Sequence, residues 1–205
     1  DNKLQLAVHA MGDKAIQTVI DVTKEMEPWL TTMPSVRIEH ASLMTDQMFA
    51  KIANSKMNYA LVTQPIFFFA EDESYRHYLS PAQFKLAYRV KTMLNSQAML
   101  GLSSDAPCTP WAEPDSPFYS IYAAVTRKAA NDDIVNAEEA ITVPQAILGY
   151  TRDGAKIGGF DDNGTLEVGK AADFVILNDD IFTVAHSELK NIHVNETWMA
   201  GKRVM

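Results

Sequence analysis

The stretch LAVHAMGDKA, residues 6–15, shows the pattern from which the fold is predicted. An apolar run over residues 4–8, interrupted only by Gln5, leads into His9, and Gly12-Asp13 then precedes a segment whose apolar residues recur at helical spacing. A short apolar run followed by an amphipathic segment is typical of a buried strand that leads into a helix. We therefore predict a strand-to-helix unit here, with its helix ending before Pro28.

The same order of strand and helix recurs along the chain. Strands are predicted over residues 35–39, 57–63 and 98–102, and helices from Thr45-Asp46, over about 81–95, from Pro114 and Pro117, and near Thr142. Residues 67–78 are predicted to form a long aromatic connection. Strands that alternate with helices favour parallel βαβ units, so we predict an α/β fold.

The pattern changes after Gly164. Two apolar runs, residues 173–177 and 192–198, are separated by a turn signal at Asn178-Asp179-Asp180. This arrangement is typical of antiparallel strands. We predict a second, smaller β element over residues 165–205.

The composition excludes several classes of function. The chain has 205 residues, with 18 Lys and Arg against 26 Asp and Glu, and it lacks the basic runs of nucleic-acid-binding proteins. Its apolar runs are far shorter than the roughly 20 residues that span a bilayer. The single cysteine, Cys108, cannot form an internal disulfide and is predicted to be a small buried thiol. We therefore predict a cytoplasmic protein without nucleic-acid or membrane partners.

Three ionisable residues occupy equivalent places in these units. His9 and His40 close the first and second predicted strands, and Asp105 follows the fourth. Parallel α/β sheets and barrels place their active sites at the carboxyl ends of their strands. Two imidazoles and a carboxylate that converge there suit a cation such as Zn²⁺, whereas a single histidine at a strand end is usually a hydrogen-bonding loop residue.

The third predicted strand ends in the polar pair Thr63 and Gln64. Gln64 is a candidate substrate-binding residue, and ordinary hydrogen bonding within a loop explains both side chains equally well. The aromatic run that follows, Phe67-Phe68-Phe69, suits either an apolar substrate pocket or ordinary packing.

Four segments in a fixed order carry a family resemblance: HAMGD at residues 9–13, RIEH at 37–40, SDAP at 104–107 and GTLEVGKAADFV at 164–175. Together they resemble the metal-dependent amidohydrolase superfamily, and specifically its amidohydrolase family 3 branch, which includes N-substituted formamide deformylases. In that branch the first three segments follow strands five, six and eight of a (β/α)8 barrel, and the fourth returns the chain into a β-sandwich. The resemblance covers essentially the whole chain.

The resemblance implies the C-terminal half of a TIM (β/α)8 barrel over residues 1–164 and the C-terminal strands of a companion β-sandwich over residues 165–205. It implies that His9, His40 and Asp105 bind a divalent metal, which we predict to be zinc as one or two ions, and that Asp105 and His40 are also catalytic. Such a metal makes hydroxide available at neutral pH, and Asp105 passes a proton to the leaving amine. The implied substrates are small non-peptide amides, namely N-formyl or N-acyl amines.

One departure from the family is large. The His-x-His pair after strand one and the residue after strand four, which decides between one metal and two, are absent from this sequence. We therefore expect the chain to be a C-terminal fragment of a longer enzyme and to be inactive alone. Two alternatives stay open: a heterocycle deaminase of the same superfamily, in which His40 contacts the attacking water or the substrate, and a non-catalytic scaffold or interaction module.

The two outer strands of such a half barrel present unpaired edges, which favour pairing with another chain. We predict that the 205-residue chain forms homo-oligomers through these edges or is poorly soluble. Sedimentation velocity tests this prediction, and a well-behaved monomer would contradict it.

Overall fold

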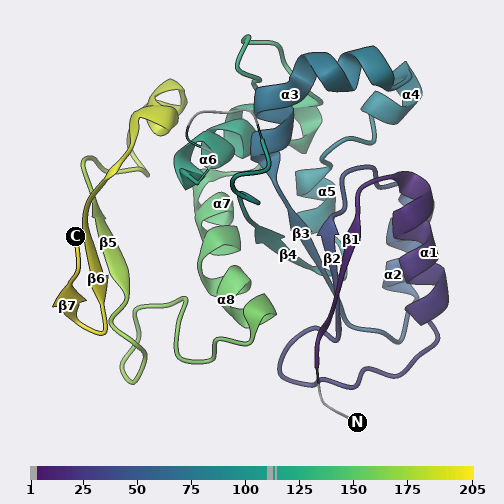
Figure 1. Ribbon diagram of the computed structural model, residues 1–205, viewed down its shortest axis with the longest axis horizontal. Helices are drawn as coiled ribbons and strands as arrows, with labels where there is room; N and C mark the ends of the chain where they lie inside the picture. The colour runs from purple at the N-terminus through teal and green to yellow at the C-terminus, as the bar shows by residue number, and fades with distance from the viewer. Residues whose placement is uncertain (1–3, 110–112, 114) are drawn as a thin grey trace.

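The computed structural model describes residues 4–109, 113 and 115–205, and two β-sheets organise them (Figure 1). The larger sheet has the order β1-β2-β3-β4, and every neighbouring pair is parallel. Its strands are β1 (Leu6–Ala10), β2 (Val36–His40), β3 (Tyr59–Thr63) and β4 (Met99–Leu102). The order in space follows the order in sequence, so the predicted α/β fold with parallel strands is confirmed.

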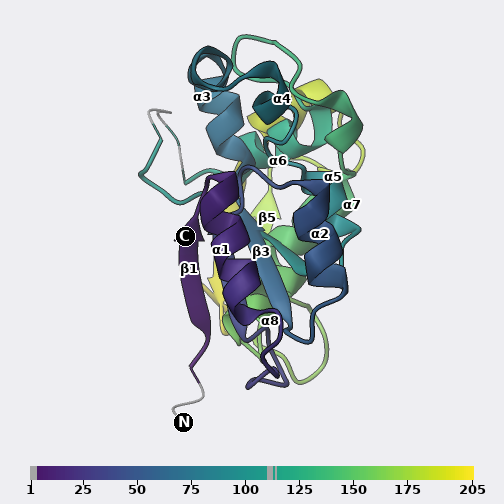
Figure 2. The same cartoon turned by 90° about the vertical axis from the view of Figure 1, so that its right-hand side faces the viewer.

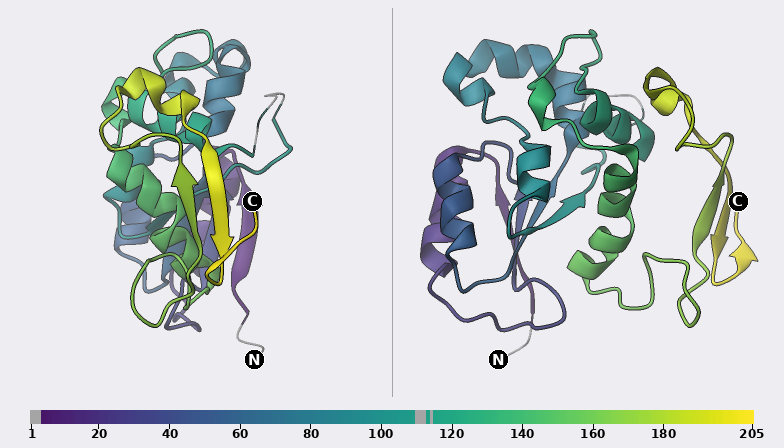
Figure 3. Two further views of the ribbon diagram at one scale, coloured as in Figure 1. Left: turned by 90° about the vertical axis from the view of Figure 1, so that its left-hand side faces the viewer. Right: turned by 180° about the vertical axis from the view of Figure 1, so that it is seen from behind.

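Helices cover the sheet from two sides. The α-helices are α1 (Asp13–Thr23), α2 (Asp46–Ala53), α3 (Pro65–Tyr78), α4 (Pro81–Phe84), α5 (Val90–Leu94), α6 (Pro117–Thr126), α7 (Val143–Tyr150) and α8 (Arg152–Gly158). Two short 3₁₀ helices are η1 (Ala137–Glu139) and η2 (His186–Asn191). The larger sheet lies between α1–α2 and α6–α8, and the smaller sheet lies beyond α6–α8 (Figures 1 and 3).

Two predictions about the helices were wrong. The aromatic connection over residues 67–78 is helical in α3, which has Pro65 in its first turn and a break in helical geometry at Glu71. Its three phenylalanines are buried in the core, so they pack as part of the fold. The helix predicted over residues 81–95 is divided into α4 and α5. The next helix begins at Pro117, and Pro114 lies outside the described residues.

The core forms where α1 and α2 pack on the sheet. Ile16 and Ile20 of α1, together with Val36 and Ile38 of β2, are fully buried. These α1 residues are separated by four positions, so they lie on one face of the helix. Burial of each such side chain stabilises the fold by about 1.5–3 kcal/mol.

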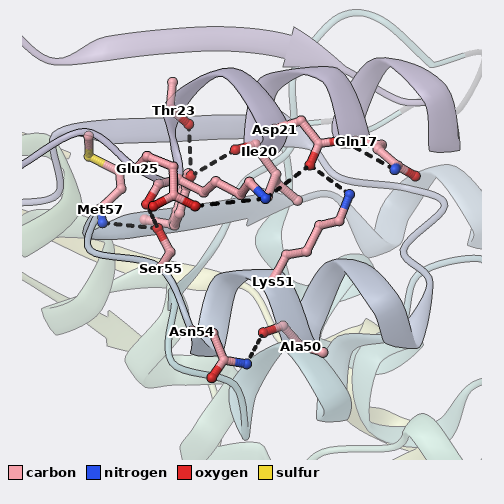
Figure 4. A network of polar contacts seen from close by, with 12 residues as sticks. Gln17, Ile20, Asp21, Thr23, Glu25, Ala50, Lys51, Asn54, Ser55 and Met57 are labelled. Atoms are coloured by element: carbon pink, nitrogen blue, oxygen red, sulfur yellow. Dashed lines mark hydrogen bonds and ion pairs between the residues drawn. The ribbon is translucent and has the colours of Figure 1, made fainter.

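A polar network connects α1 to α2 at the solvent-facing side of this core (Figure 4). Lys51 Nζ donates to Asp21 Oδ1 at 2.6 Å, and Gln17 donates to the other carboxylate oxygen at 3.2 Å. The hydrogen bond from Lys51 lowers the pKa of Asp21. Ser55 Oγ donates to the Lys24 carbonyl at 2.8 Å, so the segment after α2 is also attached to the end of α1.

The smaller sheet is antiparallel, as predicted. It contains β5 (Phe174–Leu177), β6 (Val194–Met199) and β7 (Lys202–Arg203), and the Phe174 and Trp198 rings stack with centroids 5.6 Å apart. An open apolar cleft of about 940 Å³ separates this sheet from α6–α8, and its lining includes Phe118, Ile147 and Val175.

The first strand forms one edge of the larger sheet (Figure 2). Ala7 and His9 on this strand are exposed, whereas the residues of β3 are mostly buried. Among the described residues, no helix has the length and apolarity needed to cross a bilayer. The cytoplasmic location predicted from composition stays a prediction.

Glu71 connects the irregular point of α3 to the loop after β4. Burial raises the pKa of Glu71 above its ordinary value of 4.5, and a hydrogen bond with Thr109 partly opposes that shift. Between 4.5 and the higher pKa, the folded protein therefore holds a proton that the unfolded chain has lost. Consequently this group lowers the free energy of unfolding as the pH rises through that interval.

We predict that the free energy of unfolding of Glu71→Gln rises relative to that of the wild type when the pH is raised from about 4 to about 7. The reason is that the wild-type carboxyl becomes a buried charge over this interval, whereas the amide stays neutral. Urea unfolding of both proteins at the two pH values measures this difference. The exposed Glu73 on the same helix provides the control, since Glu73→Gln removes a carboxylate that is already in water. An equal difference between Glu71→Gln and wild type at both pH values would contradict the prediction.

Gly149 lies where α7 contacts β4. A Cβ atom at this position would lie 2.9 Å from Leu102 Cγ. Alanine favours a helix over glycine by about 1 kcal/mol, but overpacking a core costs about 1–3 kcal/mol. We therefore predict that Gly149→Ala lowers the free energy of unfolding by about 1 kcal/mol.

In a Leu102→Ala background, the same Gly149→Ala substitution should raise stability, because the clashing atoms are gone and the helix preference remains. The denaturant midpoints of the wild type, the two single variants and the double variant measure this change in the sign of the Gly149→Ala effect. Stabilisation by Gly149→Ala in the wild-type background would show that Leu102 moves aside without cost.

Candidate active site

The strand register brings four strand ends to one edge of the sheet. His9 pairs with Glu39, Ala10 pairs with His40, and Thr63 pairs with Leu102. Because parallel strands all point the same way, the residues that follow them meet at that edge. His9 and His40 lie at the carboxyl ends of β1 and β2, and Gln64 directly follows β3. Asp105 lies three residues after the end of β4.

The backbone turns sharply where β2 ends. His40 and Ala41 have φ values of 70° and 47°, and Asp105 has a φ of 50°. Non-glycine residues rarely adopt this left-handed conformation, and its cost is of order 1–3 kcal/mol. The amide of Ala41 donates to the Ala10 carbonyl at 3.1 Å, which holds the turn against β1.

His40 is the centre of the site and is only 6% exposed. Its Nε2 atom lies 3.9 Å from Asp105 Oδ2, a separation too long for a hydrogen bond. The His9 ring meets the His40 ring edge to face, with centroids 4.4 Å apart. His40 therefore contacts the His9 ring and has its Nε2 near Asp105, so the three residues proposed from the sequence as metal ligands are neighbours.

Gln64 is 1% exposed and contacts His40 directly. Gln64 Oε1 lies 3.0 Å from His40 Nδ1, and Gln64 Nε2 donates to Ser103 Oγ at 2.9 Å. The role in substrate binding predicted for Gln64 stays a prediction. Thr63 is fully buried, and its hydroxyl has no hydrogen-bond partner among the described residues.

Two side chains contact His40 or Gln64 in ways that the sequence did not indicate. Phe67 stacks on the His40 ring with centroids 5.9 Å apart, and Ser103 anchors the Gln64 amide. The aromatic run 67–69 was recognised, but its register on α3 was not predicted. Ser103 stands two positions before Asp105 in the SDAP region, and a serine in a strand-end loop has no periodic signal that would distinguish it.

The loop after β4 is more open than its neighbours. The Asp105 side chain is 39% exposed, and its carbonyl accepts a hydrogen bond from the Cys108 amide at 2.9 Å. Cys108 is exposed, so the prediction of a buried thiol was wrong. Residues 105–108 are all exposed, whereas Thr109 is buried and contacts Glu71, so the loop turns inward only after Cys108.

The donor atoms fit part of a metal site. A nitrogen and an oxygen bound to one tetrahedral zinc ion lie about 3.4 Å apart, given bond lengths of about 2.1 Å. The 3.9 Å gap between His40 Nε2 and Asp105 Oδ2 is close to this separation, and imidazole and carboxylate are ligands that zinc accepts. Within residues 4–109, 113 and 115–205, however, no group of three or more His, Cys, Asp or Glu side chains forms a complete cation site.

Comparison with known proteins gives a consistent result. The model of the amidohydrolase family matches residues 1–205. The chain is 28% identical to N-substituted formamide deformylase of Arthrobacter pascens over 97% of its own length and 36% of that protein. It is also 28% identical to the putative amidohydrolase YtcJ of Bacillus subtilis, over 98% of the chain and 37% of that protein.

Solved structures agree with this result. The crystal structure of an uncharacterised metal-dependent hydrolase from Pyrococcus horikoshii matches with a TM-score of 0.74 and 30% identity, over 90% of this chain and 36% of that one. The chain thus spans about a third of the length of the curated relatives it matches. Since the family model covers every residue, the chain belongs to the amidohydrolase family.

Proposed function

We propose that the protein containing this chain hydrolyses the C–N bond of a small non-peptide amide, an N-formyl or N-acyl amine, with a divalent metal, zinc, held partly by His9, His40 and Asp105. The observation that carries the proposal is the juxtaposition at the strand ends, where His40 Nε2 lies 3.9 Å from Asp105 Oδ2 and the His40 ring contacts the His9 ring. The formamide deformylase of Arthrobacter pascens, matched over 97% of this chain, supports the choice of amide.

Asp105 and His40 differ in solvent exposure, and we infer different roles for them from this difference. Asp105 is partly exposed, so its carboxylate can take a proton from water and deliver it to the departing amine. His40 is buried, and its Nε2 lies 3.9 Å from Asp105 Oδ2, where a nitrogen lone pair can bind a cation. A divalent ion bound there would lower the pKa of water to about 7 and polarise the carbonyl.

We further propose that other parts of the same protein complete the site, as half of a (β/α)8 barrel would require. Two edges of the larger sheet, at β1 and β4, are unpaired among the described strands, and the exposed His9 lies on one of them. In this proposal, further strands of the same chain pair with these edges and supply the remaining ligands. The smaller sheet, β5–β7, would then be part of a β-sandwich, and the chain alone would be inactive.

Deamination of a heterocycle is the alternative within the same family. An N-isopropylammelide isopropylaminohydrolase from Burkholderia multivorans matches with a TM-score of 0.60 but only 17% identity. At that identity the likeness concerns the fold alone. The amide is therefore the substrate class that we test first.

The test uses the protein with its complete chain. We predict bound zinc in the purified protein and turnover of an N-substituted formamide. Asp105→Asn should lower kcat by about 10²–10⁴-fold, because the neutral amide cannot accept a proton. His9→Ala and His40→Ala should each reduce the metal content, measured by elemental analysis.

The control is Asp161→Asn, which removes an exposed carboxylate from the loop after α8 and should change neither metal content nor turnover. Wild-type activity on aminated heterocycles but not on formamides would favour the alternative. Absence of any bound metal, or full activity of Asp105→Asn, would reject the proposed mechanism.

A further inference from the structure

The carboxamide of Gln64 connects the ends of three strands. Gln64 directly follows β3, and its side chain contacts His40 at the end of β2 and Ser103 just after β4. Its two polar atoms are both engaged, and its side chain is buried. A group in this position can influence the site without touching a substrate.

The contacts of Gln64 define which way its amide faces. Gln64 Nε2 lies 3.4 Å from the Val62 carbonyl oxygen, which can only accept a hydrogen bond. An amide oxygen in that place would meet another oxygen, so the NH₂ group faces Val62 and Ser103. The Gln64 oxygen consequently faces His40 Nδ1 at 3.0 Å.

An acceptor opposite Nδ1 determines the tautomer of a neutral histidine. Nδ1 must carry the proton in order to donate to Gln64 Oε1, which leaves the lone pair on Nε2. Nε2 is the atom that faces Asp105 across the 3.9 Å gap. The basic nitrogen of His40 is therefore directed at the place where a cation or a reacting atom would lie.

We propose that Gln64 is a positioning residue that holds His40 in the Nδ1–H tautomer, with its Nε2 lone pair directed at the space beside Asp105. This proposal deepens the proposed function and rests on it for the role of His40. It assigns Gln64 an action through His40 instead of contact with substrate.

The support of Gln64 extends into the helical layer. The Ser103 amide donates to the Thr63 carbonyl at 3.1 Å, and the Ser103 carbonyl accepts from the Tyr150 hydroxyl at 3.2 Å. Ser103 is thus fixed from both β3 and α7. The rings of Phe67 and His9 restrict the plane of the His40 ring, whereas Gln64 forms a hydrogen bond with its Nδ1 atom.

The test reads the tautomer directly, in the complete, metal-free protein labelled with ¹⁵N-histidine. Long-range ¹H–¹⁵N spectra distinguish Nδ1–H from Nε2–H, and the spectrum of His40→Gln identifies the His40 signals. We expect Nδ1–H for His40 in the wild type. An Nε2–H tautomer there would overturn the proposal without any need for a Gln64 variant.

Three variants separate positioning from general structure. Gln64→Leu should lose the preference for Nδ1–H and lower zinc affinity by about 10–100-fold, the usual effect of removing a partner behind a metal ligand. Gln64→Glu keeps an acceptor opposite Nδ1, and its second oxygen can accept from the Ser103 hydroxyl in spite of the lost contact with the Val62 carbonyl, so it should retain the Nδ1–H tautomer that Gln64→Leu loses. Thr63→Val removes the neighbouring buried hydroxyl, which has no partner among the described residues, and should change neither.

Competition with a chromophoric zinc chelator measures the affinity. An unchanged tautomer together with an affinity within about threefold in Gln64→Leu would overturn the proposal. In turnover assays, a raised KM with unchanged kcat would also overturn it, because that pattern indicates substrate binding. If no amide is hydrolysed by the wild type, the proposed function fails, while the tautomer and zinc measurements still decide the role of Gln64.

Discussion

The parallel pairing of four short strands in one register is the constraint on which the candidate site depends. Side chains alternate between the two faces of a strand, so a slip of one residue would reverse the side on which every side chain of that strand lies. A slip of β2 would remove Val36 and Ile38 from the core and displace His40 from Gln64. The apolar residues that hold the register therefore also hold the site, and the two cannot vary independently.

The buried side of the site carries the cost of desolvating polar groups. His40, Gln64 and Thr63 are all nearly inaccessible to water. An unsatisfied polar group in such a place costs about 1–3 kcal/mol. His40 and Gln64 largely avoid that cost through their hydrogen bond and through Ser103, whereas the Thr63 hydroxyl finds no partner in the described part of the chain. The buried polar side chains and the left-handed backbone of His40 both cost free energy of folding, and both lie at the same edge of the sheet. Such a combination is typical of functional sites.

Much of this arrangement could be predicted from the sequence, because hydrophobic periodicity locates strands and strand ends define the edge where His9, His40 and Asp105 meet. The helical state of residues 67–78 could not, since consecutive phenylalanines have no period that distinguishes a buried helix from a connection. Side-chain partners also depend on packing. Arg127 illustrates this, because it is fully buried with its guanidinium 4.3 Å from the Phe68 ring centroid, although charged residues are usually exposed.

The two sides of the site are organised to different degrees. On the side of β2, β3 and β4, His40 is held by Gln64, Phe67 and the turn at Ala41, so the orientation of its ring is fixed. On the β1 side, His9 is exposed and contacts His40 only through ring edges. Preorganised groups bind with little loss of conformational entropy, whereas a free side chain must be ordered at a cost of about 0.5–1.5 kcal/mol. Binding that involves both histidines therefore carries its ordering cost at His9, on the β1 side, and little of it at His40.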